Sequence, residues 1–110
     1  MDLSIIIVNW NTRDLLRNCL RSIAVGSEHY QVETIVVDNN STDGSREMVA
    51  ADFPVVKLLN SGANVGFAKA NNLGLRYAHA PLILFLNPDT ELRYQSLSLM
   101  IRFMSAAPTV

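Results

Sequence analysis

Cysteine and histidine are scarce in this chain of 110 residues, which contains one cysteine, Cys19, and two histidines, His29 and His79. A lone cysteine cannot form a disulfide within the chain, and the histidines are too far apart in sequence for the ligand spacing of a zinc site. Both histidines lie in expected loops, where solvated side chains are expected rather than catalytic ones. These shortages exclude a disulfide-rich secreted scaffold and a structural zinc module, and they fit a reducing compartment.

Positive charge is not in excess either. The chain has 9 Lys and Arg residues against 10 Asp and Glu residues, a net charge of −1 and a pI near 6.0. We therefore expect no nucleic-acid partner. The first apolar run, residues 3–8, is too short for the apolar region of a signal peptide or for a membrane span, so we predict a cytoplasmic protein.

Two common phosphate-binding loops are also missing. The first apolar run is followed by Asn9-Trp10-Asn11-Thr12, where a dinucleotide-binding fold has a glycine fingerprint, and no glycine-rich loop ends in Lys-Ser or Lys-Thr. A classical dehydrogenase and a P-loop NTPase are therefore excluded. A receiver-like or other flavodoxin-type signalling domain would have paired acids after the first strand, where this chain has asparagines.

The chain does contain a regular alternation of strand and helix patterns. Apolar runs predict strands at 3–9, 32–38, 55–59 and 82–86, and apolar residues at helical spacing predict helices at 12–24, 43–51, 67–78 and 93–105. This order is typical of an α/β fold, a Rossmann-like and mostly parallel sheet flanked by helices. Residues 82–86 are apolar without alternation, which predicts a strand covered on both faces. Residues 108–110 resemble the approach to another strand, so we expect a truncated fold.

Polar residues at the helix starts have a structural explanation beside a functional one. Asn11 and Thr12 are good N-cap residues for the first helix, and Ser41 and Asp43 can accept hydrogen bonds from free backbone N–H groups of the second. For Ser41 and Asp43, capping and a role in a site explain the sequence equally well. Cys19 lies on the apolar stripe of the first helix and is predicted to be a core residue.

Three of the predicted strands end abruptly in polar residues. The first runs into residues 9–12, the second into residues 38–45, and the fourth into Asn87-Pro88-Asp89-Thr90. The carboxyl ends of parallel strands meet at one edge of an open α/β sheet, and ligands bind at that edge. We predict that these ends form a single binding site.

The side chains at these ends suit a nucleoside diphosphate. Asp38 can accept the ring N–H of uracil or thymine, while Asn9 and Asn40 can both donate and accept. Trp10 offers a flat face for stacking, although the role of a partly buried anchor under the first helix explains it equally well. Asp89 follows a proline and is a single carboxylate, sufficient for Mg²⁺ or Mn²⁺ when diphosphate oxygens complete the coordination shell.

Four motifs occur in a fixed order on these elements. They are residues 4–11 (SIIIVNWN), 37–45 (VDNNSTDGS), 64–74 (NVGFAKANNLG) and 86–90 (LNPDT). Each motif is weak alone, but together they resemble the nucleotide-binding half of a family 2 glycosyltransferase of the GT-A fold. The resemblance covers nearly the whole chain and is greatest to bacterial rhamnosyltransferase-like members.

The resemblance implies an inverting enzyme that transfers a sugar from a dTDP- or UDP-linked donor to a glycan or lipid-linked acceptor in cell-envelope polysaccharide synthesis. It implies a divalent cofactor, Mg or Mn, held by Asp89 as the last carboxylate of an Asp-x-Asp motif. The expected nucleotide-binding residues are Asn9, Trp10, Asn11, Asp38, Asn40, Asn64, Gly66, Lys69, Asn72 and Asn87.

Two positions depart from the family pattern. Asn87 replaces the first Asp of the metal motif, which should weaken both ribose contact and metal affinity. Asn71 stands where many relatives have an arginine near the diphosphate. Lys69 can supply that charge only if the helix begins later than predicted, because two residues along a helix correspond to about 200° around its axis.

The resemblance further implies that no catalytic residue lies in residues 1–110, because in relatives the general base is an Asp or Glu beyond the metal motif. We expect this base past Val110, with most of the acceptor site. Residues 1–110 are then the N-terminal nucleotide-sugar-binding part of a peripheral enzyme at the inner face of the plasma membrane. Alone, they should be inactive and should self-associate through uncovered apolar surface. The alternative, favoured by Asn87, is a non-catalytic nucleotide-sugar-binding module.

Overall fold

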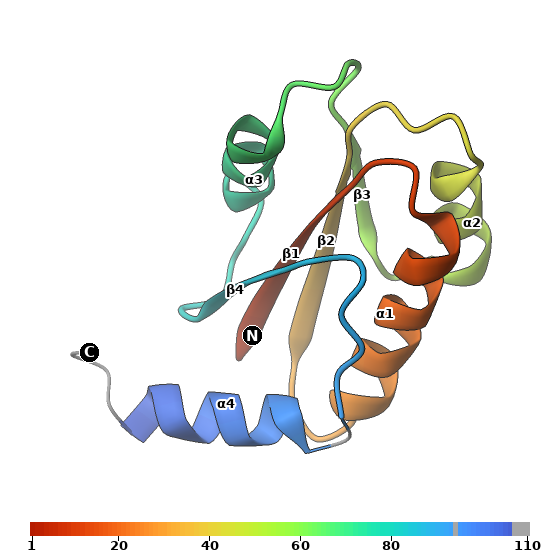
Figure 1. Ribbon diagram of the computed structural model, residues 1–110. Coiled ribbons are helices and arrows are strands. Elements are labelled where there is room, and N and C mark those ends of the chain that lie inside the picture. The colour runs from red at the N-terminus through yellow and green to blue at the C-terminus, as the bar shows by residue number, and fades with distance from the viewer. Residues whose placement is uncertain (94, 107–110) are drawn as a thin grey trace.

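The structure is a computed structural model that describes residues 1–93 and 95–106. Its elements in chain order are β1 (Leu3–Asn9), α1 (Arg13–Gly26), β2 (Val32–Asp38), α2 (Ser45–Asp52), β3 (Lys57–Asn60), α3 (Phe67–Leu75), β4 (Ile83–Leu86) and α4 (Ser96–Ala106) (Figure 1). The predicted alternation of strands and helices is confirmed. The prediction for residues 108–110 lies outside the described residues.

No helix in the described part of the chain has the length and apolar character needed to cross a lipid bilayer.

The strands form one parallel sheet in the order β3-β2-β1-β4. The side of β1 that carries Ile5 and Ile7 packs against α1, α2 and α4, while the side that carries Ile6 and Val8 packs against α3 through Ala70. Figure 1 shows the sheet between α3 and the α1–α2 pair. Because successive strand residues point to opposite faces, the buried runs divide the core into two layers. The predicted Rossmann-like class is therefore confirmed.

Close contact between α3 and the sheet depends on a glycine. A Cβ atom on Gly74 would lie 2.7 Å from Ile6 Cγ2 and 3.2 Å from Val37 Cγ2. The small residues Ala70 and Gly74 therefore let α3 approach the sheet closely. Phe67 at the start of the helix is 60 % exposed and Tyr77, just past its end, is 39 % exposed, so neither is a core residue. The helix also ends at Leu75, before the predicted residue 78.

Two predictions about the strands are corrected. The third strand begins at Lys57 rather than at residue 55, and Val55 is 94 % exposed. The fourth strand is not covered on both faces, because Phe85 is 50 % exposed. In the described residues β4 pairs only with β1, and α3 packs mainly over β1 and β2. An apolar run alone cannot distinguish a central strand from an edge strand whose outer face is open.

The prediction that Cys19 is a core residue is confirmed, since the side chain is completely buried. Burial raises the pKa of the Cys19 thiol to about 11, and the nearby carboxylates of Asp89 and Glu91 add to the increase. A thiol with this pKa is neutral at physiological pH. Cys19 is therefore a packing residue of α1 rather than a nucleophile.

Candidate functional site

The carboxyl ends of β2, β1 and β4 lie side by side along one edge of the sheet. Asn9 pairs in register with Asp38, and Ile7 pairs with Leu86, the last residue of β4. The polar residues that follow the three strands therefore emerge at the same edge, as the sequence predicts. This edge is where open α/β sheets bind ligands.

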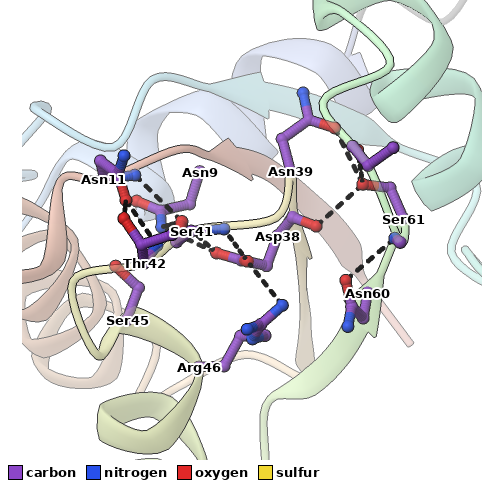
Figure 2. A network of polar contacts seen from close by, with 12 residues as sticks. Asn9, Asn11, Asp38, Asn39, Ser41, Thr42, Ser45, Arg46, Asn60 and Ser61 are labelled. Carbon is purple, nitrogen blue, oxygen red and sulfur yellow. Dashed lines mark hydrogen bonds and ion pairs between the residues drawn. The ribbon is translucent and has the colours of Figure 1, made fainter.

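A hydrogen-bond network joins the ends of β1 and β2 at this edge (Figure 2). Asn9 Nδ2 donates to Asp38 Oδ1 at 3.1 Å, and Ser41 Oγ donates to the same oxygen at 2.7 Å. The backbone N–H of Ser41 donates to Asp38 Oδ2 at 2.8 Å, and Arg46 Nη1 lies 3.7 Å from that oxygen. Asp38 is only 1 % exposed, and a buried carboxylate needs such partners. Both of its oxygens are thus occupied by groups of the protein itself.

Asn9 is also satisfied within the protein. Its side chain is fully buried, Nδ2 donates to Asp38 and to Ser41 Oγ, and Oδ1 accepts the Thr12 hydroxyl at 2.6 Å. Thr12 occupies the N-cap position of α1, as predicted, but its side chain makes no capping hydrogen bond to the helix. The buried amide of Asn9 draws the hydroxyl away from the helix end. Asn9 therefore orients Asp38 and the start of α1 from within the network.

The Asp43 carboxylate joins the starts of two helices. Its Oδ2 accepts the backbone N–H of Arg13, the first residue of α1, at 2.9 Å, and its Oδ1 accepts the N–H of Ser45, the first residue of α2, at 3.0 Å. Burial alone would raise the pKa of the Asp43 carboxyl, but the hydrogen bonds from Ser45 and Arg13 outweigh burial and lower the pKa below its usual range. The capping explanation of Asp43 is confirmed, whereas Ser41 serves the network around Asp38.

Three exposed side chains stand beside this network. Trp10 is 54 % exposed, so it is only partly buried and part of its surface is open to a ligand. Asn11 and Asn40 are exposed and have positive φ angles of 52° and 68°. Asparagine tolerates this conformation better than most residues, and such backbone strain clusters at functional sites. Asn11 Oδ1 accepts the backbone N–H of Thr42 at 2.7 Å and so joins the loops after β1 and β2.

The loop from β3 into α3 continues the same edge, because Asn60 pairs with Asp38 at the end of the sheet. Asn64 is exposed, and its Oδ1 accepts the N–H of Gly66 at 3.1 Å. Gly66 has a φ of 86° that favours glycine, and α3 begins at the next residue. Free backbone N–H groups of the first turn give this helix start a partial positive charge at the edge of the sheet.

The predicted residues of α3 are placed on its outer surface. Lys69 and Asn72 are exposed, and Asn71 is half-buried. Because α3 begins at Phe67, as predicted, Lys69 and Asn71 point in different directions around the helix axis. A contact of Lys69 with a ligand would therefore come from a different side of α3 than a contact of Asn71.

The segment after β4 carries the predicted metal ligand. Asn87 and Asp89 are both exposed, and the N–H of Thr90 donates to the carbonyl of Asn87 at 3.1 Å, which forms a turn around Asp89. Within residues 1–93 and 95–106 no group of three or more His, Cys, Asp and Glu side chains is placed to hold a metal ion. A cation at Asp89 thus requires oxygen ligands from outside these side chains, such as diphosphate oxygens.

Sequence reasoning did not single out Asn39 or Arg46 as site residues. Asn39 is 3 % exposed and contacts the loop before α3, and Arg46 pairs with Asp38 from α2. Strand alternation offered a signal for Asn39, because the residue that directly follows Asp38 at the end of β2 should point to the opposite face if the alternation continues. Arg46 carried no such signal, because its contact depends on how α2 packs against the sheet.

The histidines lie away from this edge. His29 and His79 are strongly exposed, as expected for solvated side chains. His79 Nδ1 lies 2.8 Å from Glu33 Oε2, and Ser4 Oγ donates to Glu33 Oε1 at 2.7 Å. Ser4 and Glu33 lie near the amino ends of β1 and β2. Their hydrogen bonds therefore hold the segment that leads into β4 against the amino-terminal edge of the sheet, opposite the candidate site.

A family model described as glycosyl transferase family 2 matches residues 4–110. Among curated proteins, the low-salt glycan biosynthesis hexosyltransferase Agl10 of Haloferax volcanii is 34 % identical over 100 residues, which cover 87 % of this chain and 30 % of that protein. An N-acetylglucosaminyl-diphospho-decaprenol L-rhamnosyltransferase of Mycobacterium tuberculosis is 33 % identical over 70 residues, 64 % of this chain and 22 % of the relative. The chain thus spans less than a third of either protein.

Among solved structures, the mannosyltransferase PcManGT from Pyrobaculum calidifontis, in complex with GDP-Man and Mn²⁺, superimposes with a TM-score of 0.87 at 26 % identity. The superposition covers 99 % of this chain and 33 % of that one. The likeness to a rhamnosyltransferase and to a nucleotide-sugar enzyme agrees with what the four motifs indicate.

Proposed function

This chain belongs to glycosyltransferase family 2 and has the GT-A fold, and on that premise we propose that residues 1–110 are the donor-binding part of an inverting glycosyltransferase. The donor is a nucleotide diphosphate sugar, and the acceptor is a glycan or lipid-linked intermediate of cell-envelope polysaccharide synthesis. The observation that carries the proposal is the meeting of the polar ends of β1, β2 and β4 at one edge of the sheet. The matching glycan-biosynthesis relatives support the same activity.

The exposed residues at this edge are the proposed ligand contacts. Trp10 stacks on the base, and Asn11 and Asn40 contact the base and ribose. Asn9 and Asp38 form the floor of the pocket. For the Asp38 carboxylate to accept a hydrogen bond directly from the base N–H, one of its present partners, Ser41 or Arg46, must move aside.

The diphosphate and the sugar lie, in this proposal, along the loop and helix after β3. The contacts come from Asn64, Gly66, Lys69 and Asn72, with the free N–H groups at the start of α3 favouring the negative charge. Asn87 lies on the ribose side. The ordered loop and the start of α3 at the ligand-binding edge support this placement.

Asp89 is the proposed ligand of Mg²⁺ or Mn²⁺, with the remaining ligands supplied by diphosphate oxygens and water. The bound cation would stabilise the negative charge of the departing diphosphate. Support comes from the exposed carboxylate at the end of β4 and from the Mn²⁺ complex of PcManGT. Because Asn87 adds no charge, the affinity of this chain for the cation alone should be weak.

Nuclear magnetic resonance titration of the ¹⁵N-labelled chain with UDP, dTDP and GDP, each with and without Mg²⁺, tests the proposal. Bound nucleotide should shift the amide signals of Trp10, Asn40 and Gly66 and leave α4 unchanged, and the method detects dissociation constants of about 1 mM and weaker. The nucleotide that binds best identifies the base. Shifts confined to α4, or none with any nucleotide, would refute the proposal.

The remaining proposals concern the parent protein. The general base and most of the acceptor site lie past Val110, and the enzyme works in the cytoplasm as a peripheral protein at the inner face of the plasma membrane.

Exposed apolar residues, among them Phe85 and Phe103, support self-association of residues 1–110. Sedimentation at increasing concentration tests self-association, and a monomer throughout would refute it.

A non-catalytic nucleotide-sugar-binding module is the alternative function, and Asn87 favours it because it replaces a carboxylate of the metal motif. Sugar transfer by the full-length parent separates the two functions. A parent that binds the donor, carries no acidic residue in the acceptor site and transfers no sugar would support the alternative.

A further inference from the structure

The loop of residues 61–66 and the first turn of α3 receive little support from packing. Residues 62–69 are all exposed, so no core side chain holds them in place. Their position must come from hydrogen bonds. Several of these are local turns that do not connect the loop to the sheet, such as the bond from the N–H of Gly62 to Asn60 Oδ1 and the bond from the N–H of Gly66 to Asn64 Oδ1.

The side chain of Asn39 contacts this loop at both ends of the loop. Figure 2 shows its contact with Ser61. Its Oδ1 accepts the N–H of Val65 at 3.3 Å, and its Nδ2 donates to the carbonyl of Gly66 at 3.4 Å. Oδ1 also lies 3.0 Å from Ser61 Oγ, whose single proton is shared with the carbonyls of Ala63 and Asp38. Asn39 itself is fixed, because it is 3 % exposed and its N–H donates to the carbonyl of Asn9 at 2.8 Å. Ser61 has further bonds to the backbone of Asp38, but these hold only the beginning of the loop.

The chemistry of this contact requires an amide. Asn39 accepts from an N–H and donates to a carbonyl at the same time, which a carboxylate cannot do. An aspartate would keep the acceptor oxygen, lose the donor and place negative charge against the Gly66 carbonyl. Alanine would remove the hydrogen bonds between Asn39 and the loop and leave the N–H of Val65 without this partner.

We propose that Asn39 is a positioning residue that holds the loop of residues 61–66 and the start of α3 in the geometry needed to bind the diphosphate of the donor. This inference rests on the proposed function, because the loop borders the diphosphate only if the edge of the sheet binds a nucleotide sugar. Asn39 acts through Val65 and Gly66 and does not touch the ligand itself. Its effect falls on the diphosphate part of the donor and not on the nucleoside part.

The test compares UDP with uridine, each titrated in Mg²⁺ and followed by amide shifts, in the wild-type chain and in Asn39→Ala and Asn39→Asp. We expect UDP to bind about tenfold more weakly to both variants, while the affinity for uridine stays within about twofold. Hydrogen exchange at the amides of Val65 and Gly66 should become faster in Asn39→Ala without any ligand. Asn60→Ala is the matched control, because it removes a local turn of the same loop, and it should leave both affinities within about twofold.

The outcomes separate the inference from the function on which it rests. A wild-type chain that binds none of UDP, dTDP and GDP overturns both, and if dTDP or GDP binds best, that diphosphate and its nucleoside replace UDP and uridine in the comparison. If the wild type prefers UDP and the two Asn39 variants bind it equally well, the inference alone fails. Equal losses for uridine and UDP would also overturn it, since they indicate a general structural role. Should Asn39→Ala not fold, Asn39→Asp and Ser61→Ala give the same comparison.

Discussion

Asn9 and Asp38 occupy paired positions on the neighbouring strands β1 and β2. Their side chains are also joined, because the Asn9 amide donates a hydrogen bond of 3.1 Å to the Asp38 carboxylate. Both side chains are buried, so the bond lies where solvent cannot replace it. The ends of two strands are thereby held together from inside the candidate site.

Replacement of Asp38 by asparagine should destabilise the fold. The NH2 group of the new amide would oppose a donor on one side, either the Asn9 amide or the Ser41 N–H, and Arg46 would lose its counter-charge. We expect a loss of about 2 to 4 kcal/mol in the free energy of unfolding, measured by urea denaturation. Asp52→Asn is the matched control, because Asp52 is half exposed and 3.7 Å from Arg17, and it should cost less than about 1 kcal/mol. Equal costs would contradict the role given to Asp38.

Gly74→Ala should also destabilise the protein, although alanine favours helix formation. The added methyl group would lie 2.7 Å from Ile6 Cγ2, so α3 must move away from the sheet. We expect a cost of about 1 to 3 kcal/mol in thermal or urea unfolding. In an Ile6→Ala background the same substitution should cost much less, because the obstructing side chain is gone. An unchanged cost there would show that the close contact is not its cause.

Acidification should weaken the contact between Glu33, Ser4 and His79. Burial alone would raise the pKa of Glu33, but hydrogen bonds from His79 and Ser4 outweigh it and lower the pKa below the ordinary value of 4.5. A lowered pKa in the folded state means that this stabilisation is complete above the unfolded value and is lost as the pH falls through the folded value. Between about pH 5 and pH 3 the wild type should therefore lose more stability than Glu33→Gln. The control Glu47→Gln changes an exposed position, and this variant should lose as much stability over the same pH range as the wild type does.

The fluorescence of Trp10 should report nucleotide binding. It is the one tryptophan of the chain, and its ring is half exposed beside Asn11. Stacking of a base should quench the emission, and Trp10→Ala should weaken nucleotide binding by about 1 to 3 kcal/mol as measured by calorimetry. Trp10→Phe should retain part of the affinity. If calorimetry detects nucleotide binding but the Trp10 emission does not change, the base must bind away from Trp10.

Much of the fold followed from local pattern. The alternation of apolar strands and amphipathic helices predicted every element from β1 to α4, since the periods of 2 and 3.6 residues are properties of the sequence itself. The exposure of Phe85 did not follow from pattern. Whether an apolar strand residue is covered depends on which helix crosses it, and in the described residues α3 packs mainly over β1 and β2.

The candidate site, like the fold, could be predicted from the sequence only in part. The strand-end positions of Asp38 and Asn9 were evident from the sequence, and parallel strands necessarily place such ends at one edge. Sequence pattern could not reveal that these two side chains bond each other, that Asp43 caps two helices, or that Asn39 holds the loop before α3. Each of these contacts joins segments more than twenty residues apart.

The sequence by itself thus determined the class of fold, the polar strand ends and the edge at which they gather. These depend on residue type and short-range periodicity, which a single chain displays directly. Only the tertiary structure decided which polar groups are occupied within the protein, as Asn9 and Asp38 are, and which are open to a ligand, as Trp10 and Asn40 are. The physical reason is that a buried polar atom takes whichever partner packing brings within hydrogen-bond distance, and packing is settled by the whole chain.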